Sequence, residues 1–350
     1  MLLAELVGRT LVGGFSGTSL SQTMRRALER GERAGVVLFR RNLTESFAEI
    51  ATLAHDVHSS SREVPFVCVD QEGGLVARLG PPALILPPAR RLAEKGGIDL
   101  ITRVGHVQGR ELRALGFNVN FAPVLDVDSC STNPIIGQRA YSDVAEKVAE
   151  LAIAYALALQ ASGVLACGKH FPGHGDTHTD SHLVLPHVTA SRDILEAREL
   201  VPFRHAAAAG LRSLMTAHVV YEALDPDRPA TISRRICEEL LRNAIGFKGL
   251  LFSDDLEMKA ITLPIADAAV ASIHAGCDVL LICSNEEAQD EAHAALVREG
   301  ERSLAFRSRL EDAARRSTRA RETWAHYERP KDLAAEFNTQ EARLICEALA

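Results

Sequence analysis

The stretch of residues 143–170, DVAEKVAELAIAYALALQASGVLACGKH, contains a unit that recurs along the chain. In Asp143–Ser162 apolar residues return at helical spacing, and Gly163–Gly168 is a short apolar run with the length of a buried strand. Lys169 and His170 follow that run directly. A helix, a buried strand and polar residues at the strand's carboxyl end together indicate a parallel α/β sheet.

The same alternation continues through most of the chain. Short apolar runs predict eight strands, Thr10–Phe15, Ala34–Phe39, Val64–Val69, Phe117–Pro123, Gly163–Gly168, Leu211–Ala217, Gly249–Phe252 and Cys277–Cys283. Helical periodicity predicts helices between them, Leu20–Glu32, Phe47–Ser59, Asp99–Leu115, Asp143–Ser162, Ile194–Ala209, Arg234–Ile245 and Ile265–Ala275. Eight such strands predict an α/β fold of the (β/α)8 TIM-type barrel class. A doubly wound open sheet is the alternative, because apolar runs alone do not prove closure.

The chain is predicted to be one barrel domain over residues 1–350. Its length suits a barrel with insertions, and no low-complexity linker divides it. Residues 285–350, after Ser284, are expected to form an extra helical layer. Arginines of this region alternate with acidic residues, which predicts a solvated helix face. They are Arg315, Arg316, Arg319 and Arg321, among Glu311, Asp312 and Glu322.

Composition narrows the classes of partner. The net charge is -7 and no basic stripe with interleaved aromatic residues occurs, so nucleic acid is not an expected partner. No apolar run approaches the roughly 20 residues that span a bilayer, and Met1–Arg9 lacks the basic start of a secretory signal. The 7 cysteines lie mostly in apolar runs and include no Cys-x-x-Cys pair. Buried thiols in a reducing compartment, the cytoplasm, are therefore expected.

Polar residues cluster where the predicted strands end. Five of the strands run into side chains able to carry chemistry, namely Asp70, Asp126 with Asp128, Lys169 with His170, His218, and Asp254 with Asp255. Barrel enzymes build their active sites at the carboxyl ends of the strands. We therefore expect these side chains to meet in one site.

The densest of these segments is KHFPGHGDTHTDSH, residues 169–182. Its four histidines, His170, His174, His178 and His182, are spaced by four residues, which on a helix would suggest a metal site. Proline and glycines at 172, 173 and 175 argue against a helix, so a long functional loop is predicted. A metal-dependent hydrolase stays open as an alternative, and a surface loop without a role is less favoured.

Asp180 stands two residues before His182 within this loop. A carboxylate bonded to one ring nitrogen fixes the tautomer of an imidazole and raises its basicity. Such a pair can donate and recover a proton near neutral pH. The triplet alone is a weak signal, since an ordinary exposed pair is more common.

Two adjacent acids, Asp254 and Asp255, follow the seventh predicted strand. Neighbouring side chains of an extended chain point to opposite faces. Asp254 is therefore the candidate nucleophile at the barrel mouth, and Asp255 is predicted to cap the next helix. The alternative is that both are helix caps or ion-pair partners.

Other strand-end groups suit the recognition of a polyol. Asp70 can accept hydrogen bonds from hydroxyl groups, and Arg78 and Arg139 can donate in fork geometry. Structural ion pairs of the two arginines, for instance with Glu72 or Asp143, are nearly as plausible at this stage.

Together these residues resemble glycoside hydrolase family 3. The similarity is closest to its single-domain bacterial branch, the β-N-acetylglucosaminidases (β-hexosaminidases) of peptidoglycan recycling, and extends from about Leu11 to Ser284. The motifs are DQEGGLVAR at 70–78, NFAPVLDVD at 120–128, NPIIGQR at 133–139, KH at 169–170, PGHGDT at 172–177, DSH at 180–182 and FSDDL at 252–256. Glu257 departs from the family pattern, in which a small residue is common, with little expected effect on the chemistry.

The resemblance implies a retaining exo-β-N-acetylglucosaminidase that acts on peptidoglycan fragments. It implies Asp254 as nucleophile, His182 as acid/base and Asp180 as the residue that orients it. It implies sugar binding by Asp70, Arg78, Arg139, Lys169 and His170. A monomer without metal or cofactor, with a small sugar as its only partner, is the corresponding expectation. A phosphorylase that uses phosphate in place of water, and a non-catalytic sugar-binding barrel, are the competing interpretations.

Overall fold

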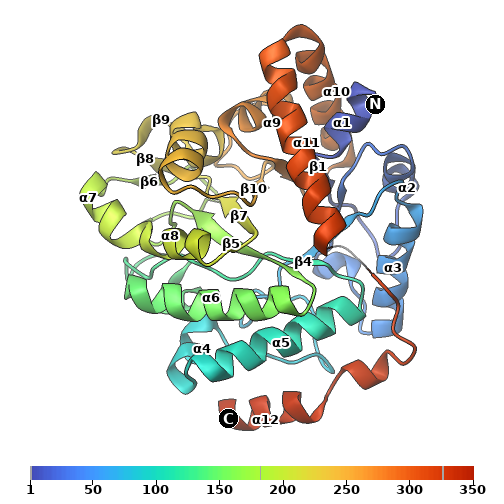
Figure 1. Cartoon of the computed structure of the whole chain (residues 1–350), viewed down its shortest axis with the longest axis vertical. Coiled ribbons are helices and arrows are strands. Elements are labelled where there is room, and N and C mark those ends of the chain that lie inside the picture. The colour runs from blue at the N-terminus through green and yellow to red at the C-terminus, as the bar shows by residue number, and fades with distance from the viewer. Residues whose placement is uncertain (1, 182, 325–326) are drawn as a thin grey trace.

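The centre of the molecule is a closed barrel of parallel strands, seen in a computed structural model that describes residues 2–181, 183–324 and 327–350 (Figure 1). Its strands are β1 Leu11–Gly13, β2 Gly35–Val37, β3 Phe66–Val69, β4 Val119–Asn120, β5 Leu165–Phe171, β7 Ser213–Thr216, β10 Leu250–Asp255 and β11 Val279–Ile282. Neighbours around the barrel follow the order β1-β11-β10-β7-β5-β4-β3-β2. The eight predicted strands and the barrel are confirmed, and closure between β1 and β11 rules out the open sheet.

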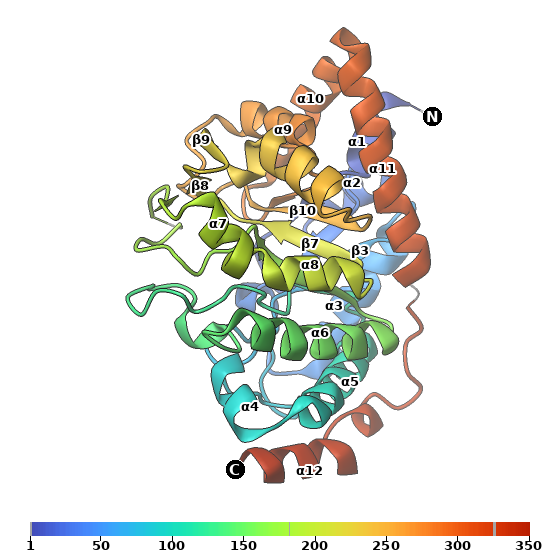
Figure 2. The ribbon, with the colours of Figure 1, turned by 60° about the vertical axis from the view of Figure 1, so that its left-hand side comes forward.

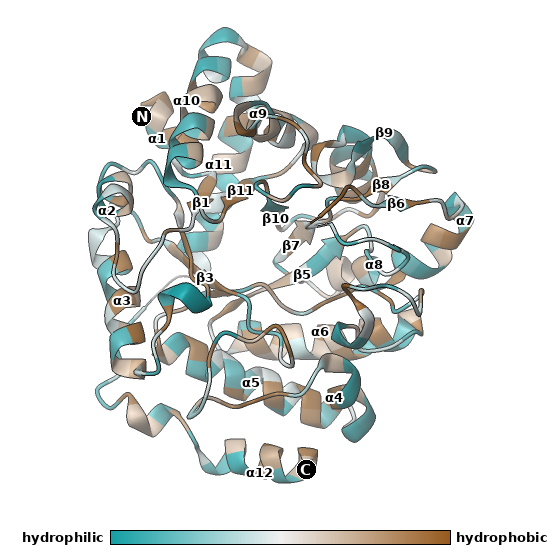
Figure 3. Cartoon of the chain, turned by 180° about the vertical axis from the view of Figure 1, so that it is seen from behind, coloured by the Kyte–Doolittle hydropathy of each residue, from teal (hydrophilic) through white to brown (hydrophobic). Residues whose placement is uncertain are grey.

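Two strands continue beyond their predicted ends. β5 extends to Phe171 and β10 to Asp255, so Lys169 and His170 lie in a strand and not in the loop to which they were assigned. The backbone ladder explains the difference, since the Lys169 carbonyl accepts from Leu125 N at 2.6 Å and the Phe171 carbonyl from Ala217 N at 2.7 Å. In Figure 3 most strands are brown, whereas β5 and β10 show teal, hydrophilic residues.

Helices surround the barrel on its outside (Figure 2). They are α2 Gln22–Glu29, α3 Phe47–Ser60, α5 Ile98–Ala114, α6 Ala145–Ala161, α8 Val201–Ala208, the π-helix η5 Arg235–Ala244, α9 Ile265–Ala275 and α10 Glu286–Arg302. The predicted helix at 194–209 is divided into α7 Arg192–Ile194, the π-helix η3 Leu195–Glu199 and α8. Two short helices, α1 Leu3–Gly8 and α4 Ala89–Lys95, were not predicted.

The inside of the barrel is packed with apolar side chains. Phe252 of β10 makes edge contacts with Phe66 and Phe121, with ring centroids 5.7 and 5.4 Å apart. Cys68 and Cys167 belong to the same cluster and are fully buried. All the cysteines are free thiols and five are buried, as expected from their apolar surroundings.

A small second sheet lies above the carboxyl ends of the barrel strands. It joins β6 His187–Val188, β8 Val220–Tyr221 and β9 Asp225–Pro229 and was not predicted. The buried Tyr221 hydroxyl donates to the carbonyl of Gly173 at 2.7 Å. This sheet therefore supports the segment that follows β5.

The helices after α10 pack at two other places. α11 Leu304–Trp324 brings Ala320 and Trp324 against the apolar cluster inside the barrel, on the side of the molecule opposite β8 and β9 in Figure 2. α12 Gln340–Leu349 packs on α5 and α4. No helix among the described residues combines the length and the apolar character needed to cross a membrane.

The expectation of a solvated arginine face on α11 is wrong for two residues. Arg321 is buried and binds Glu63 at 3.0 Å, and Arg316 binds the buried Asp278 at 3.0 Å. Arg315, by contrast, is exposed and pairs with Asp312 on its own helix. Some arginines of α11 thus face solvent and others bind acids at the amino end of the barrel. The spacing of charges in the sequence did not distinguish the two groups.

Candidate active site

A cavity of about 280 Å³ opens at the carboxyl ends of the barrel strands. Its lining includes the predicted nucleophile and all the predicted sugar-binding residues, Asp70, Arg78, Arg139, Lys169, His170 and Asp254. These residues come from segments separated by up to 184 positions, and barrel closure brings them together. Three larger hollows, of about 780, 560 and 360 Å³, lie among outer helices and their flanking loops, and no described candidate residue lines them.

The proposed acid/base pair is described only in part. Asp180 is partly buried, and its backbone carbonyl accepts hydrogen bonds from Leu183 N and Val184 N, both at 3.0 Å. His182 lies outside the described residues, so the geometry of the pair stays a prediction. Ser181, between them in the chain, is buried and lines the cavity.

Lys169 is the centre of a charged cluster on one wall. Its Nζ lies 2.8 Å from Oδ1 of Asp70 and 2.7 Å from Oε1 of Glu72. Arg139 binds both carboxylate oxygens of Glu72, at 2.9 and 2.8 Å. Burial alone would raise the pKa of Glu72, but the charges of Arg139 and Lys169 hold it well below its ordinary value. The structural ion pair considered for Arg139 is therefore present, with Glu72 as its partner.

The turn after β3 holds Asp70 and Arg78 in place. Gln71 N donates to the side chain of Asn120 at 2.9 Å, and Gln71 Oε1 accepts from Arg78 N at 2.7 Å. Arg78 Nη2 lies 3.6 Å from Oδ2 of Asp70. Its Nε is buried and has no hydrogen-bond partner among the residues that the structure describes. Asp70 and Arg78 thus reach the cavity from one hydrogen-bonded turn. The Nε–H group of Arg78 is available to donate a hydrogen bond to a ligand.

His170 is held by the buried Asp126, which was not among the predicted catalytic or sugar-binding residues. Asp126 Oδ2 lies 2.7 Å from His170 Nδ1, and Asp126 Oδ1 accepts from the backbone N–H groups of His170 and His174 at 3.0 and 2.7 Å. Burial opposes ionisation of Asp126, but His170 and these bonds hold its pKa below the ordinary value. A carboxylate at Nδ1 places the ring proton there and turns Nε2 away from Asp126. The position of Asp126 at the end of a predicted strand was the one feature of the sequence that could have indicated this role.

Asp254 lies across the cavity at the end of β10. Its Oδ1 accepts from Asp255 N at 2.8 Å. Burial alone would raise the pKa of the Asp254 carboxyl, but His218, His170 and this hydrogen bond hold it below the ordinary value. The carboxyl group is thus ionised at neutral pH, as a nucleophile requires.

The role expected for Asp255 as a helix cap is wrong. The next helix, α9, begins at Ile265, after a turn. Asp255 Oδ1 instead accepts from Glu257 N at 3.1 Å and Cys283 N at 3.2 Å, and its backbone carbonyl bonds Nε2 of His218 at 2.9 Å. Burial raises the pKa of Asp255 to about 7. Both acids line the cavity, because the turn bends the chain directly after the strand.

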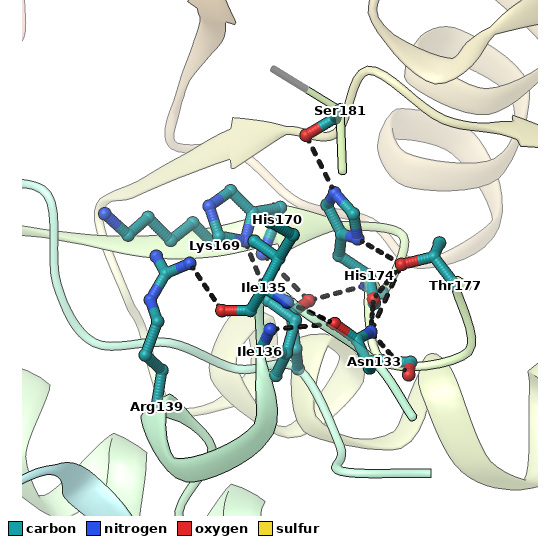
Figure 4. Close-up of polar contacts among 12 residues, drawn as sticks. Asn133, Ile135, Ile136, Arg139, Lys169, His170, His174, Thr177 and Ser181 are labelled. Atoms are coloured by element: carbon teal, nitrogen blue, oxygen red, sulfur yellow. Dashed lines mark hydrogen bonds and ion pairs between the residues drawn. The ribbon is translucent and has the colours of Figure 1, made fainter. Parts of the chain in front are cut away.

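The segment after β5 is pinned from several sides (Figure 4). Asn133 Nδ2 donates to the carbonyls of His174 and Gly175 at 2.9 and 2.8 Å and to Thr177 Oγ1 at 3.1 Å. Asn133 Oδ1 accepts from backbone N–H groups of its own loop at 2.8 Å. This part is a loop, as predicted, and not the helix that a four-histidine metal face would need.

The described histidines of this segment are not arranged as a metal site. Within the described ranges, no group of three or more His, Cys, Asp or Glu side chains is placed to hold one ion. The rings of His170 and His174 meet edge to face, with centroids 5.6 Å apart. Both nitrogens of His174 already contact hydroxyl groups.

Comparison with known proteins places the chain. Residues 5–320 match the glycosyl hydrolase family 3 N terminal domain. The chain belongs to glycoside hydrolase family 3. A β-hexosaminidase of Nitrosomonas eutropha is 39% identical over 285 residues, 79% of this chain and 81% of that protein.

Solved structures of family 3 agree in fold. The β-N-acetylglucosaminidase from Paenibacillus sp. str. FPU-7 aligns with a TM-score of 0.93 and 35% identity, over 100% of this chain and 68% of that one. Native NagZ from Neisseria gonorrhoeae aligns with a TM-score of 0.83 and 31% identity, over 98% and 96%. The chain is accordingly a glycoside hydrolase, and its substrates are sugars.

Proposed function

We propose that the protein is a retaining exo-β-N-acetylglucosaminidase that releases terminal N-acetylglucosamine from the non-reducing end of peptidoglycan fragments. The observation that carries the proposal is that Asp254 lines one cavity together with Asp70, Arg78, Arg139, Lys169 and His170. The β-hexosaminidase relatives support the choice of sugar. We further infer a cytoplasmic monomer in which the helices after Ser284 belong to the barrel domain.

The first half-reaction forms a covalent intermediate. Asp254 attacks the anomeric carbon, the glycosidic C–O bond breaks, and the leaving oxygen takes a proton from His182. In the second half-reaction neutral His182 takes a proton from water, the oxygen of that water bonds the anomeric carbon, and the ester to Asp254 breaks. Asp180 orients His182. In the free enzyme His182 carries no negative charge, so it does not repel the Asp254 carboxylate as a second carboxylate would.

The sugar is held by groups whose positions are set before it binds. Asp70 accepts hydrogen bonds from sugar hydroxyl groups, and Lys169, Arg78 and His170 line the same cavity. Lys169 is buried between Asp70 and Glu72, and although burial lowers its pKa these charges more than offset that and raise it. It therefore stays a cation throughout the reaction. Such preorganised donors act strongly where water is excluded.

Replacing Asp254 tests the proposal. Asp254→Ala should abolish turnover of an aryl β-N-acetylglucosaminide and leave the fold intact by circular dichroism. Asp193→Ala, an exposed acid of α7, is the matched control and should stay fully active. Near-normal activity of Asp254→Ala would overturn the nucleophile assignment.

The product identifies the reaction class. Wild-type protein should form the β-anomer of N-acetylglucosamine first, whether or not phosphate is present. An initial α-anomer would contradict retention, and a sugar phosphate formed only with phosphate would identify a phosphorylase. N-acetylglucosaminyl-anhydromuramic acid and chitobiose, compared in the same assay, test the leaving-side preference.

A further inference from the structure

We propose that His174 is a positioning residue that holds Ser181, the chain neighbour of the proposed acid/base residue, in place for proton transfer. The inference rests on the proposed function, in which His182 is the acid/base. Its starting point is a contact between the two halves of the loop, His174 Nε2 to Ser181 Oγ at 3.1 Å (Figure 4).

Ser181 is the inward-facing residue of an otherwise exposed stretch. It is 3% exposed, whereas His178, Thr179, Leu183 and Val184 are all exposed. Its hydroxyl reaches the His174 ring, and both residues line the cavity. A buried hydroxyl is costly without a hydrogen-bond partner, so this contact favours one placement of the stretch.

The other side of His174 is fixed to the rigid part of the loop. His174 Nδ1 lies 2.9 Å from Thr177 Oγ1, and its backbone N–H donates to Asp126 at 2.7 Å. Thr177 Oγ1 also accepts from Asn133. His174 is 2% exposed and rests against the edge of His170. The His174 ring is therefore fixed by Thr177 and Asp126 on one side and holds Ser181 on the other.

The hydrogen-bond pattern selects one tautomer. Thr177 Oγ1 donates its proton to the carbonyl of His174 at 3.2 Å, so it accepts from Nδ1–H of the ring. A neutral imidazole with its proton on Nδ1 leaves Nε2 as an acceptor. Nε2 then takes the Ser181 hydroxyl proton. Burial, and then the neighbouring His170, lower the pKa of His174 to about 4, so the ring is neutral at working pH.

The charge state of His174 differs from the one that the proposed acid/base residue needs. His182 must carry a proton in the first half-reaction, and a second cation on Ser181's partner would oppose that charge. A histidine with a lowered pKa provides the same ring shape and hydrogen bonds without a charge. His174 touches no reacting atom in this scheme and acts through Ser181.

Leaving-group dependence distinguishes positioning from a general structural role. Ser181→Ala should lose about 10-fold or more in kcat/KM on an alkyl β-N-acetylglucosaminide, which needs proton donation, and less than about 2-fold on a nitrophenyl one. His174→Asn should show the same split. Ser181→Thr, which keeps the hydroxyl, should retain activity on both. Thr179→Ala, an exposed hydroxyl of the same loop, is the matched control and should change neither.

His182→Ala, measured in parallel, separates the two levels of the proposal. If His182→Ala shows the split and Ser181→Ala does not, the positioning role is wrong and the proposed function stands. If His182→Ala loses equally on both substrates, the acid/base assignment fails and the positioning role fails with it. An equal loss on both substrates for Ser181→Ala would also overturn the inference, since misfolding lowers both rates alike.

Discussion

Lys169 shows how one residue acquires its role from the residues around it. It lies at the end of a strand, between the carboxylates of Asp70 and Glu72, and is almost completely buried. Arg139 shares Glu72, so two cations and two acids neutralise one another beside the cavity. A buried cation is tolerated only with such partners. The same arrangement leaves Lys169 charged and immobile at a position where a sugar would bind.

We predict that Lys169→Met lowers kcat/KM by about 100-fold, because the loss of one charge-assisted interaction is worth about 3 kcal/mol. Glu72 keeps Arg139, so the fold should persist with a lower melting temperature. Steady-state kinetics and thermal unfolding measure the two effects. Lys147→Met, an exposed lysine of α6, is the control. A change in kcat/KM below about 3-fold would show that Lys169 serves the structure alone.

At the scale of elements, the turn after β10 couples the nucleophile strand to its neighbour. Asp255 binds the N–H of Cys283, next to the end of β11, and Glu257 accepts from Ser284 N at 2.6 Å and Asn285 N at 3.1 Å. The Glu257 carboxylate thereby lies at the N-terminus of α10, where a negative charge interacts favourably with the helix dipole. Glu257 thus has a structural role and is not itself part of the cavity lining, although its partner Ser284 is.

Glu257→Ser should destabilise the protein by about 1 kcal/mol and leave kcat within about 2-fold. The reason is that two backbone N–H groups lose their acceptor while Asp254 keeps its own hydrogen bond. Chemical denaturation and kinetics on the same preparation check this. A large loss of kcat at unchanged stability would mean that Glu257 acts on the reaction.

Helix α5 holds the segment after the Arg78 turn through one buried acid. Glu111 Oε2 accepts from Leu84 N at 2.8 Å, and Oε1 is buried without a hydrogen-bond partner among the described residues. Burial raises the pKa of Glu111 from 4.5 to about 7, against the effect of the Leu84 N–H. The folded protein therefore binds this proton more tightly than the unfolded chain does.

The consequence is a pH dependence of stability. Because the folded pKa is the higher one, the stabilisation is fully present below about pH 4.5 and is lost as pH rises through about 7. The shift corresponds to about 3 kcal/mol at most. Glu111→Gln should flatten the fall in unfolding free energy between pH 5 and 8, and the exposed Glu150→Gln should not. Burial also raises the pKa values of Asp255 and Glu199 to about 7. These two groups remain in the Glu111→Gln variant, so its unfolding free energy should still fall with pH, but less steeply. Identical slopes for wild type and Glu111→Gln would contradict the prediction.

At the scale of the whole molecule, the two ends of the barrel differ in role: one end forms the active-site cavity and the other stabilises the fold. The carboxyl end carries the cavity, and the amino end is closed by α11 and a buried charge cluster. Asp278, just before β11, is fully buried and binds Arg242, Arg309 and Arg316 at 2.6, 2.8 and 3.0 Å. The arginines come from η5 and α11, so the cluster ties these helices to the barrel.

Asp278→Asn should lower the free energy of unfolding by about 3–5 kcal/mol, because the three arginines would lose their buried counter-charge. The kcat of the protein that remains folded should be unchanged, since Asp278 lies at the end of the barrel away from the cavity. Urea unfolding and active-site titration measure both. The exposed pair on α11 supplies the control, Asp312→Asn, with an expected loss below about 1 kcal/mol. A comparable loss in both variants would argue against a buried cluster.

The sequence alone determined the strands, most of the helices and the residues that gather at the strand ends. These depend on local properties, the periodicity of apolar residues and the change from apolar to polar where a strand leaves the core. The motif 70–78 and the segment 252–256 therefore indicated Asp70, Arg78 and Asp254 without a structure. His174 was seen as one of four histidines, and nothing local separated its role from theirs.

The tertiary structure decided which charge meets which. Arg139 binds Glu72 across 67 positions of the chain, and His170 binds Asp126 across 44. Only the closed barrel brings these pairs together, so no local pattern shows which carboxylate Arg139 or His170 binds. The burial of Arg321, the pairing of Arg316 with Asp278, the two carboxylates that line one cavity and the His174–Ser181 contact have the same origin. Each depends on how distant segments pack, and packing is a property of the whole fold and not of spacing along the chain.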